Sequence, residues 1–302
     1  SFPEFLRVFW KSRNKLVRKS ELFKTIRGRV GTRESAFQLL RDLDHYSAVY
    51  AALRDPQDPA WNPQEKHALA QLVMFNVRQP LAMLLACHAR FHDTDRANFT
   101  RIVKAVAVVS LRYNVICNLQ AHEQERLYND IAWKVSTGEH ARAADVIGAL
   151  QAVYPDDAQF KVAFSEKELR TTNSRNKKVV RYILFEIERQ RSGQDFDFES
   201  ATYNLEHILP EHPSDAWWYI EESRQDRLIY RIGNMTPLES SRNRDLGNAD
   251  YATKREIFAQ SAFQLTRAVA EHYESWDEQK IDTRQQQLAN AAAGIWKIEF
   301  GA

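Results

Sequence analysis

The chain has 302 residues, of which 44% are hydrophobic and 27% charged, and these ordinary globular values exclude wholesale disorder. It contains only 9 glycines, about half of the usual share of ~7%. Because sandwiches and barrels need glycine in many turns, this composition favours a mainly helical fold. No apolar run approaches the ~18 residues of a membrane span, so we expect a cytoplasmic protein with no membrane partner.

The formal net charge of +2 neither favours nor excludes a nucleic-acid partner. The chain begins at Ser1 without an initiator Met, and we interpret it as part of a longer protein. Cys87 and Cys117 lie in apolar helical stretches and are expected to be buried thiols in a reducing compartment.

Basic residues gather at the start of the chain. This segment is either a phosphate-facing surface or a solvated helix face, and both interpretations stay open. Its members are Arg7, Lys11, Arg13, Lys15, Arg18, Lys19, Lys24, Arg27, Arg29 and Arg33. A second basic cluster lies within residues 170–181.

Apolar residues recur at helical spacing through most of the first 191 positions. The expected helices cover about 35–54, 64–75, 80–92, 98–119, 123–136, 142–153 and 182–187. A polar linker follows at 193–200, and beyond it 202–209 and 234–238 are β-like, with helices again from about 250. We therefore expect a helical scaffold domain over 1–195 and a second domain over 196–302.

The most informative segment has an acid directly before a histidine. Residues 204–210 read Asn-Leu-Glu-His-Ile-Leu-Pro, Asn234 opens the second β-like stretch, and Asn243 follows on the next helix. This order resembles the ββα-metal (HNH) nucleases, in which a strand, a second strand and a helix carry such residues. The expected fold is therefore a helical bundle followed by an HNH motif embedded in helices.

The resemblance implies a role for each residue. His207 can take a proton from water near neutral pH. Glu206 and Asn243 would hold a divalent ion, and Asn234 would hold the loop and orient His207. Two oxygen ligands without cysteine favour Mg²⁺ or Mn²⁺ over a closed zinc site.

Several basic residues are expected to contact DNA phosphates. Arg242 and Arg244 flank Asn243, and the 170–181 cluster is expected to add salt-dependent affinity through three of its members. These three are Arg175, Lys177 and Lys178. Lys254 and Arg255, expected on the same helix as Arg242, are interpreted equally well as a solvated face. We expect the core to contain Trp217, Trp218, Trp276 and Trp296.

The stretch 251–296 makes the resemblance more specific, with Tyr251, Lys254, Ile257-Phe258, Trp276 and Arg284 in its pattern. It resembles the C-terminal nuclease domain of the GmrSD-like phage-defence proteins, a family that includes BrxU and SspE, with the SspE branch favoured. The resemblance implies a double-stranded DNA substrate and an NTPase domain that precedes this region in the full-length protein. It also implies a modification, such as phosphorothioate, that the other half senses.

Three functions are left open by the sequence. The first is a metal-dependent DNA endonuclease, in which one site nicks one strand and an oligomer could break both. The second is a catalytically inactive DNA-binding or assembly module of the same system. The third is the same chemistry on RNA.

Overall fold

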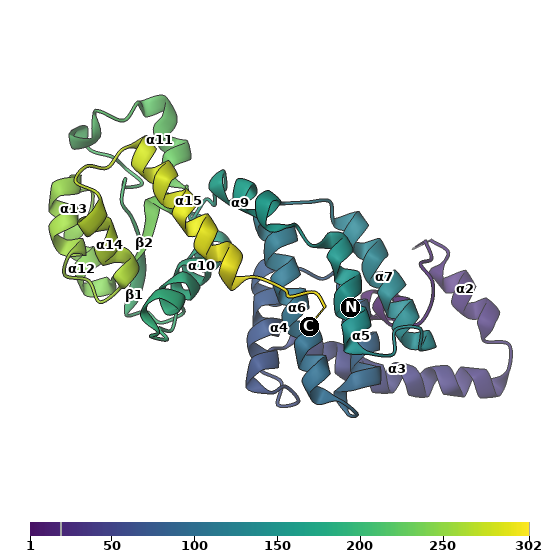
Figure 1. The fold of residues 1–302 in the computed structure, drawn as a ribbon. Helices are drawn as coiled ribbons and strands as arrows, with labels where there is room; N and C mark the ends of the chain where they lie inside the picture. Colours follow the sequence, from purple (N-terminus) through teal and green to yellow (C-terminus); the bar gives the residue numbers. More distant parts are fainter. Residues whose placement is uncertain (19, 302) are drawn as a thin grey trace. The chain divides into compact units, whose positions relative to one another are not determined.

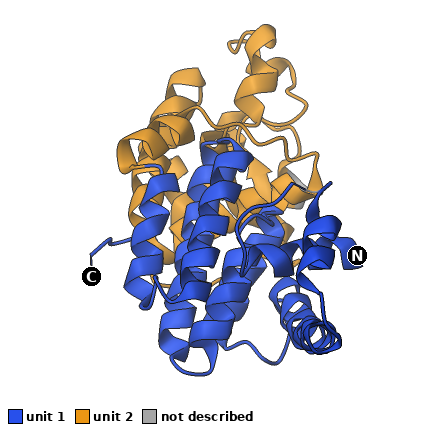
Figure 2. Cartoon of the chain, turned by 90° about the vertical axis from the view of Figure 1, so that its right-hand side faces the viewer, with its two compact units in different colours: residues 1–155, 298–302 blue, residues 156–297 orange. Residues whose placement is uncertain are grey.

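The computed structural model describes residues 1–18 and 20–301, without the side chains of residues 244 and 245. The described residues are mainly helical, with one two-stranded sheet. The chain forms two compact units, residues 1–155 with 298–302 (unit 1) and residues 156–297 (unit 2), which Figure 2 colours separately. None of the described helices combines the length and apolar character needed to span a bilayer.

Unit 1 is entirely helical in its described part. Its α-helices are α1 (Phe2–Lys11), α2 (Leu22–Arg29), α3 (Arg33–Arg54), α4 (Pro63–Phe75), α5 (Leu81–Cys87), α6 (Arg96–Ser110), α7 (Ala121–Thr137) and α8 (Ala143–Ala149). π-helical turns extend α5 (His88–His92) and α6 (Leu111–Ile116), and a 3₁₀ turn follows α8 (Leu150–Val153). The helices expected between positions 35 and 153 are thus confirmed as elements.

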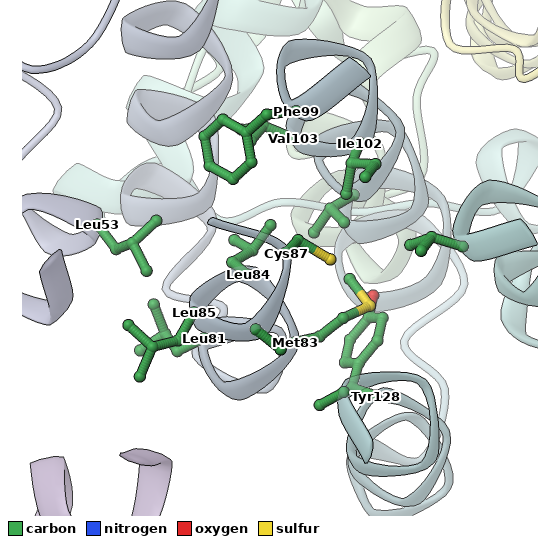
Figure 3. Close-up of a cluster of buried hydrophobic side chains, with 14 of the residues drawn as sticks. Leu53, Leu81, Met83, Leu84, Leu85, Cys87, Phe99, Ile102, Val103 and Tyr128 are labelled. Atoms are coloured by element: carbon green, nitrogen blue, oxygen red, sulfur yellow. The ribbon is translucent and has the colours of Figure 1, made fainter. Parts of the chain in front are cut away.

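The core of unit 1 surrounds α5, whose seven residues are all buried. Such a helix is apolar on every side because neighbouring helices cover it all round. In Figure 3, Met83, Leu84 and Cys87 of α5 lie among side chains that include Ile102 of α6 and Tyr128 of α7. The expectation of a buried thiol is confirmed for Cys87 and is wrong for Cys117, which is partly exposed.

Unit 2 places a small sheet among helices (Figure 1). Strand β1 (Tyr203–His207) pairs antiparallel with β2 (Met235–Glu239). The α-helices are α9 (Asp157–Ser165), α10 (Ser174–Ser192), α11 (Glu222–Ile229), α12 (Ser240–Leu246), α13 (Tyr251–Phe258), α14 (Gln264–His272) and α15 (Glu278–Ile295). Two 3₁₀ turns, Asp215–Trp217 and Ile232–Asn234, complete the unit.

Three expectations from the sequence differ from this arrangement. The units divide at residue 155/156, whereas the expected domain boundary lay near residue 195, because α9 and α10 pack with α15 and α14 of unit 2. The helix expected to carry both Arg242 and Lys254 is two helices, α12 and α13, and Gly247 lies between them with φ of 46°. Trp218 is 83% exposed, so its assignment to the core is wrong, while Trp217, Trp276 and Trp296 are buried.

Helix α15 packs closely on the turn that precedes β2. The Gly233 N–H donates to Gln285 Oε1 over 2.9 Å, and Arg284 Nη1 donates to the Gly233 carbonyl over 2.6 Å. A Cβ at Gly233 would lie 2.4 Å from the Ile281 carbonyl oxygen. Only glycine allows this approach without displacing the helix backbone.

We therefore expect Gly233→Ala to destabilise the protein by about 1–3 kcal/mol, because the overpacked methyl must push α15 from the turn. Gly294→Ala is the matched control, since Gly294 lies in α15 itself with no atom within 4 Å of the added Cβ. The control should be neutral or stabilise by up to about 1 kcal/mol. Urea unfolding measures both, and a Gly233→Ala protein as stable as the parent would contradict this packing argument.

Candidate functional site

The site is built on β1, β2 and α12, which follow one another in the order strand, strand, helix. In the antiparallel register Glu206 pairs with Thr236 and His207 with Met235. Asn234 lies directly before β2, and Asn243 lies in α12. The expected strand–strand–helix context is therefore present, with α11 and its flanking loops inserted between the strands.

Asn234 is fully buried and its carboxamide is fully hydrogen-bonded. Its Oδ1 accepts from the Leu209 N–H (2.8 Å) and from Trp276 Nε1 (3.0 Å). Its Nδ2 donates to the carbonyls of Leu209 (2.9 Å) and Ile229 (3.1 Å). A carboxamide has capacity for about four hydrogen bonds, so this side chain holds the loop after His207 and has none to spare for a substrate.

Glu206 lies near two polar side chains from later helices. Its Oε1 accepts from Lys254 Nζ of α13 over 2.5 Å, and the Asn243 side chain of α12 helps to lower its pKa. Lys254 Nζ also donates to the His207 carbonyl over 2.7 Å, so the ammonium fixes the end of β1. The structure thus places Lys254 on Glu206, and Asn243 lies close enough to act on the same carboxylate.

Burial dominates the electrostatics of this pair. It raises the pKa of Glu206, an effect that the Lys254 ammonium and the Asn243 side chain partly offset. Burial likewise lowers the pKa of Lys254, and the Glu206 carboxylate partly restores it. The interpretation of Lys254 as a solvated residue is wrong, because its side chain is fully buried. Each charge in such a pair depends on the other to offset the cost of desolvation.

The His207 side chain contacts other residues than the Glu206 side chain does. Its Nε2 lies 3.0 Å from Thr171 Oγ1 and 3.8 Å from Glu211 Oε1, and its ring meets Tyr230 edge-on at 6.1 Å. Burial lowers the pKa of His207 to about 4, and the charges of Lys254 and Lys177 add to this effect. The imidazole is therefore neutral at pH 7, the state that can accept a proton.

Thr171, Glu211 and Lys254 are site residues that the sequence analysis missed. Thr171 lies 36 positions before His207 and Lys254 lies 47 positions after it, and no periodic pattern links them to the motif. Glu211, four residues after His207, could have been suspected from that spacing alone. The fold is what brings these three groups to the end of β1.

The basic cluster at the start of α10 lies near this site. Thr171, just before α10, contacts His207, and the charge of Lys177 acts on the His207 imidazole. Lys177 is exposed, and no ion pair to its ammonium is found within the described part of the chain. Lys178 differs, because it pairs with Glu199. Arg175 is exposed and its backbone N–H donates to the Asn173 side chain, which caps the helix. Of the expected phosphate contacts, Lys177 is therefore the best placed.

The other expected DNA contacts are less exposed or lie outside the described residues. Arg242 is partly buried and lies 3.7 Å from Glu239, and the side chains of Arg244 and Lys19 lie outside the described residues. In the N-terminal basic segment, Arg7 and Lys11 both pair with Glu125. Part of that segment is thus committed to contacts within unit 1.

The donor chemistry at Glu206 fits a hard divalent cation. The oxygen donors here are the Glu206 carboxylate and the Asn243 carboxamide that acts on it, and Mg²⁺ commonly binds through one or two protein oxygens while keeping several waters. No group of three or more His, Cys, Asp or Glu side chains with metal-binding geometry is found among the described residues. Since Lys254 holds Oε1 of Glu206, a bound cation would share this carboxylate with the ammonium.

Residues 154–291 match the family described as GmrSD restriction endonucleases, C-terminal domain. The match covers slightly less than half of the chain and nearly coincides with unit 2. None of the curated proteins compared with the chain matches it. The match supports a restriction-endonuclease-type C-terminal region and agrees with the family resemblance found in the sequence.

The buried pair predicts a non-additive mutant cycle. Lys254→Met should destabilise the protein by about 3 kcal/mol, because it leaves the Glu206 carboxylate buried without its counter-charge. Adding Glu206→Gln to that variant should restore part of the loss, because no uncompensated charge remains. Urea unfolding of the two single variants and the double variant measures the coupling, and purely additive free-energy changes would show that the two groups do not depend on each other.

Proposed function

We propose that this chain is a metal-dependent DNA endonuclease of the HNH type. The proposal is supported mainly by the strand–strand–helix arrangement that carries Glu206, a buried His207 and Asn243, within a region that matches restriction-endonuclease C-terminal domains. Hydrolysis of a phosphodiester needs a base for the attacking water and stabilisation of the leaving 3′-oxygen. The chain supplies a candidate for each need.

His207 would accept the proton of the attacking water. Its low pKa of about 4 favours the neutral form, and the negative charge of a bound phosphate would raise that pKa towards the value suited to a general base. Glu206 and Asn243 would hold Mg²⁺ or Mn²⁺. That ion would supply Lewis-acid polarisation of the scissile phosphate. Asn234 keeps the end of β1 in place and contributes no group to the reaction.

The finer assignments belong to the same proposal. One such site cuts one strand, so a monomer should nick double-stranded DNA and an oligomer could make double-strand breaks. The family resemblance supports defence against phage DNA in the cytoplasm, under the control of an NTPase domain of the full-length protein. Within the family, the SspE branch, which responds to phosphorothioate-modified DNA, is favoured.

A second candidate is a catalytically inactive DNA-binding or assembly module. The ion pair between Glu206 and Lys254 favours it, because the ammonium already neutralises the carboxylate that a metal would use. The two candidates make opposite predictions for cleavage, and the same assay separates them.

The decisive assay incubates supercoiled plasmid with the protein and Mg²⁺ or Mn²⁺. We expect open-circle product, its loss with EDTA, and a decrease of at least about 100-fold for His207→Ala, since a positioned base typically contributes 10²–10⁴-fold. His122→Ala, an exposed histidine of α7 in unit 1, is the matched control and should cut normally. Equal product with the parent and His207→Ala proteins would refute the proposal, and an RNA substrate in the same assay tests cleavage of RNA.

Lys177 should contribute to DNA affinity by an electrostatic contact. Lys177→Gln is expected to weaken binding uniformly across sequences and to reduce the slope of log K against log salt by about 1. Lys66→Gln, in unit 1, is the control, because its ammonium already donates to the Gln57 carbonyl. Fluorescence anisotropy with a DNA duplex at several salt concentrations measures both, and an unchanged slope for Lys177→Gln would remove this residue from the interface.

A further inference from the structure

Two residues outside the strand–strand–helix motif hold the imidazole of His207. Thr171 lies in the segment before α10, and Glu211 lies in the loop after β1. Thr171 Oγ1 is 3.0 Å from His207 Nε2, and the same hydroxyl donates to Glu211 Oε1 over 3.4 Å. Hydrogen-bond contacts thus connect the imidazole ring of His207 through Thr171 to the carboxylate of Glu211.

The hydrogen-bonding capacity of the three side chains determines the direction of each hydrogen bond among them. A carboxylate offers only acceptors, so the contact between Thr171 and Glu211 is a hydrogen bond only when the single hydroxyl proton of Thr171 points to Glu211. The threonine oxygen is then an acceptor towards His207, and Nε2 must carry the ring proton. Nδ1 is consequently left with its lone pair, and no hydrogen bond to Nδ1 is found among the described residues.

The segment that carries Thr171 is held from both sides. The Leu169 N–H donates to the Tyr230 carbonyl over 2.9 Å, and Asn176 Nδ2 donates to the Arg170 carbonyl over 3.1 Å. The guanidinium of Arg170 lies 5.1 Å from the centre of the Tyr230 ring, the ring that also meets His207. Thr171 itself is buried. A hydroxyl held this firmly can fix the orientation of the imidazole before a substrate binds.

We propose that Thr171 and Glu211 are positioning residues that hold His207 in the Nε2–H tautomer and so present Nδ1 as the proton acceptor. This inference rests on the proposed endonuclease function. In the reaction, the water oxygen bonds to phosphorus while its proton passes to Nδ1. The bond from phosphorus to O3′ breaks, its electron pair stays on O3′, and that oxygen takes a proton from solvent.

Glu211 has a second role in this arrangement. Once Nδ1 has accepted the proton, the ring is a cation with N–H donors on both nitrogens. The Glu211 carboxylate, linked to Nε2 through Thr171, stabilises that cation, as the third group does in nucleophile–base–orienter triads. The side chain of Glu211 is 39% exposed, so it can be replaced without opening the core.

The test combines a tautomer measurement with steady-state kinetics. Long-range ¹H–¹⁵N correlation spectra of the full chain at neutral pH report which ring nitrogen of His207 is protonated. The His207 signals are assigned as those that are missing from the spectrum of His207→Ala. We expect the Nε2–H form in the parent and in Thr171→Ser, which keeps the hydroxyl, and its loss in Thr171→Val, which has the same shape without it. An Nδ1–H ring in the parent protein would overturn the inference.

The kinetics separate positioning from packing. Thr171→Val should lower kcat for plasmid nicking about 10–100-fold with KM nearly unchanged, and Thr171→Ser should restore most of the activity. Failure of Thr171→Ser to rescue, or an equal effect on kcat and KM, would refute the positioning role. Glu211→Ala covers the case in which Thr171→Val does not fold. The freed hydroxyl should then donate to Nε2 and shift the ring to Nδ1–H, whereas Glu211→Gln keeps an acceptor oxygen and should behave like the parent.

The two proposals can fail separately. If the parent protein does not cut DNA, the endonuclease proposal fails, while the spectra still decide whether Thr171 and Glu211 set the tautomer. If the parent cuts DNA and the ring is in the Nδ1–H form, the endonuclease proposal stands and the positioning inference is wrong.

Discussion

The buried carboxamide of Asn234 is the interaction on which the site depends. It joins three parts of unit 2 that are distant in sequence, namely the loop after β1, the end of α11 and Trp276 before α15. All four of its hydrogen bonds are made where water cannot replace them, so losing this side chain would leave buried backbone groups unpaired. The position of His207 at the end of β1 follows from this network. The role of Asn234 is thus structural.

The electrostatics of the site favour neutral or paired groups. Glu206 and Lys254 are buried against each other, and burial opposes the charge of each one. His207, close to two lysines, loses its proton easily for the same reason. In this site the ionisable groups are thus either paired, as Glu206 and Lys254 are, or neutral, as His207 is.

The division into two units decides to which part of the protein the basic cluster of α10 belongs. By sequence alone this helix belongs with the preceding helical scaffold, and its positive charges could face any partner. In the structure α10 lies in unit 2, packs against α14 and α15, and begins beside His207 through Thr171. The agreement between unit 2 and the matched region 154–291 places this cluster inside the nuclease-like region.

Local sequence determined the secondary structure and half of the site. Apolar spacing, prolines and glycines located the helices and the two strands, because these signals act over a few residues and do not depend on the rest of the chain. The order strand, strand, helix for Glu206, Asn234 and Asn243 also followed from the sequence, since the motif has a fixed order. The roles of Lys254 and Thr171 could not be found in this way, whereas Glu211 could have been suspected from its position four residues after His207. Those roles arise from burial and from contacts across tens of residues, which only tertiary packing decides. Trp218 was misassigned because its spacing resembles that of its buried neighbour Trp217.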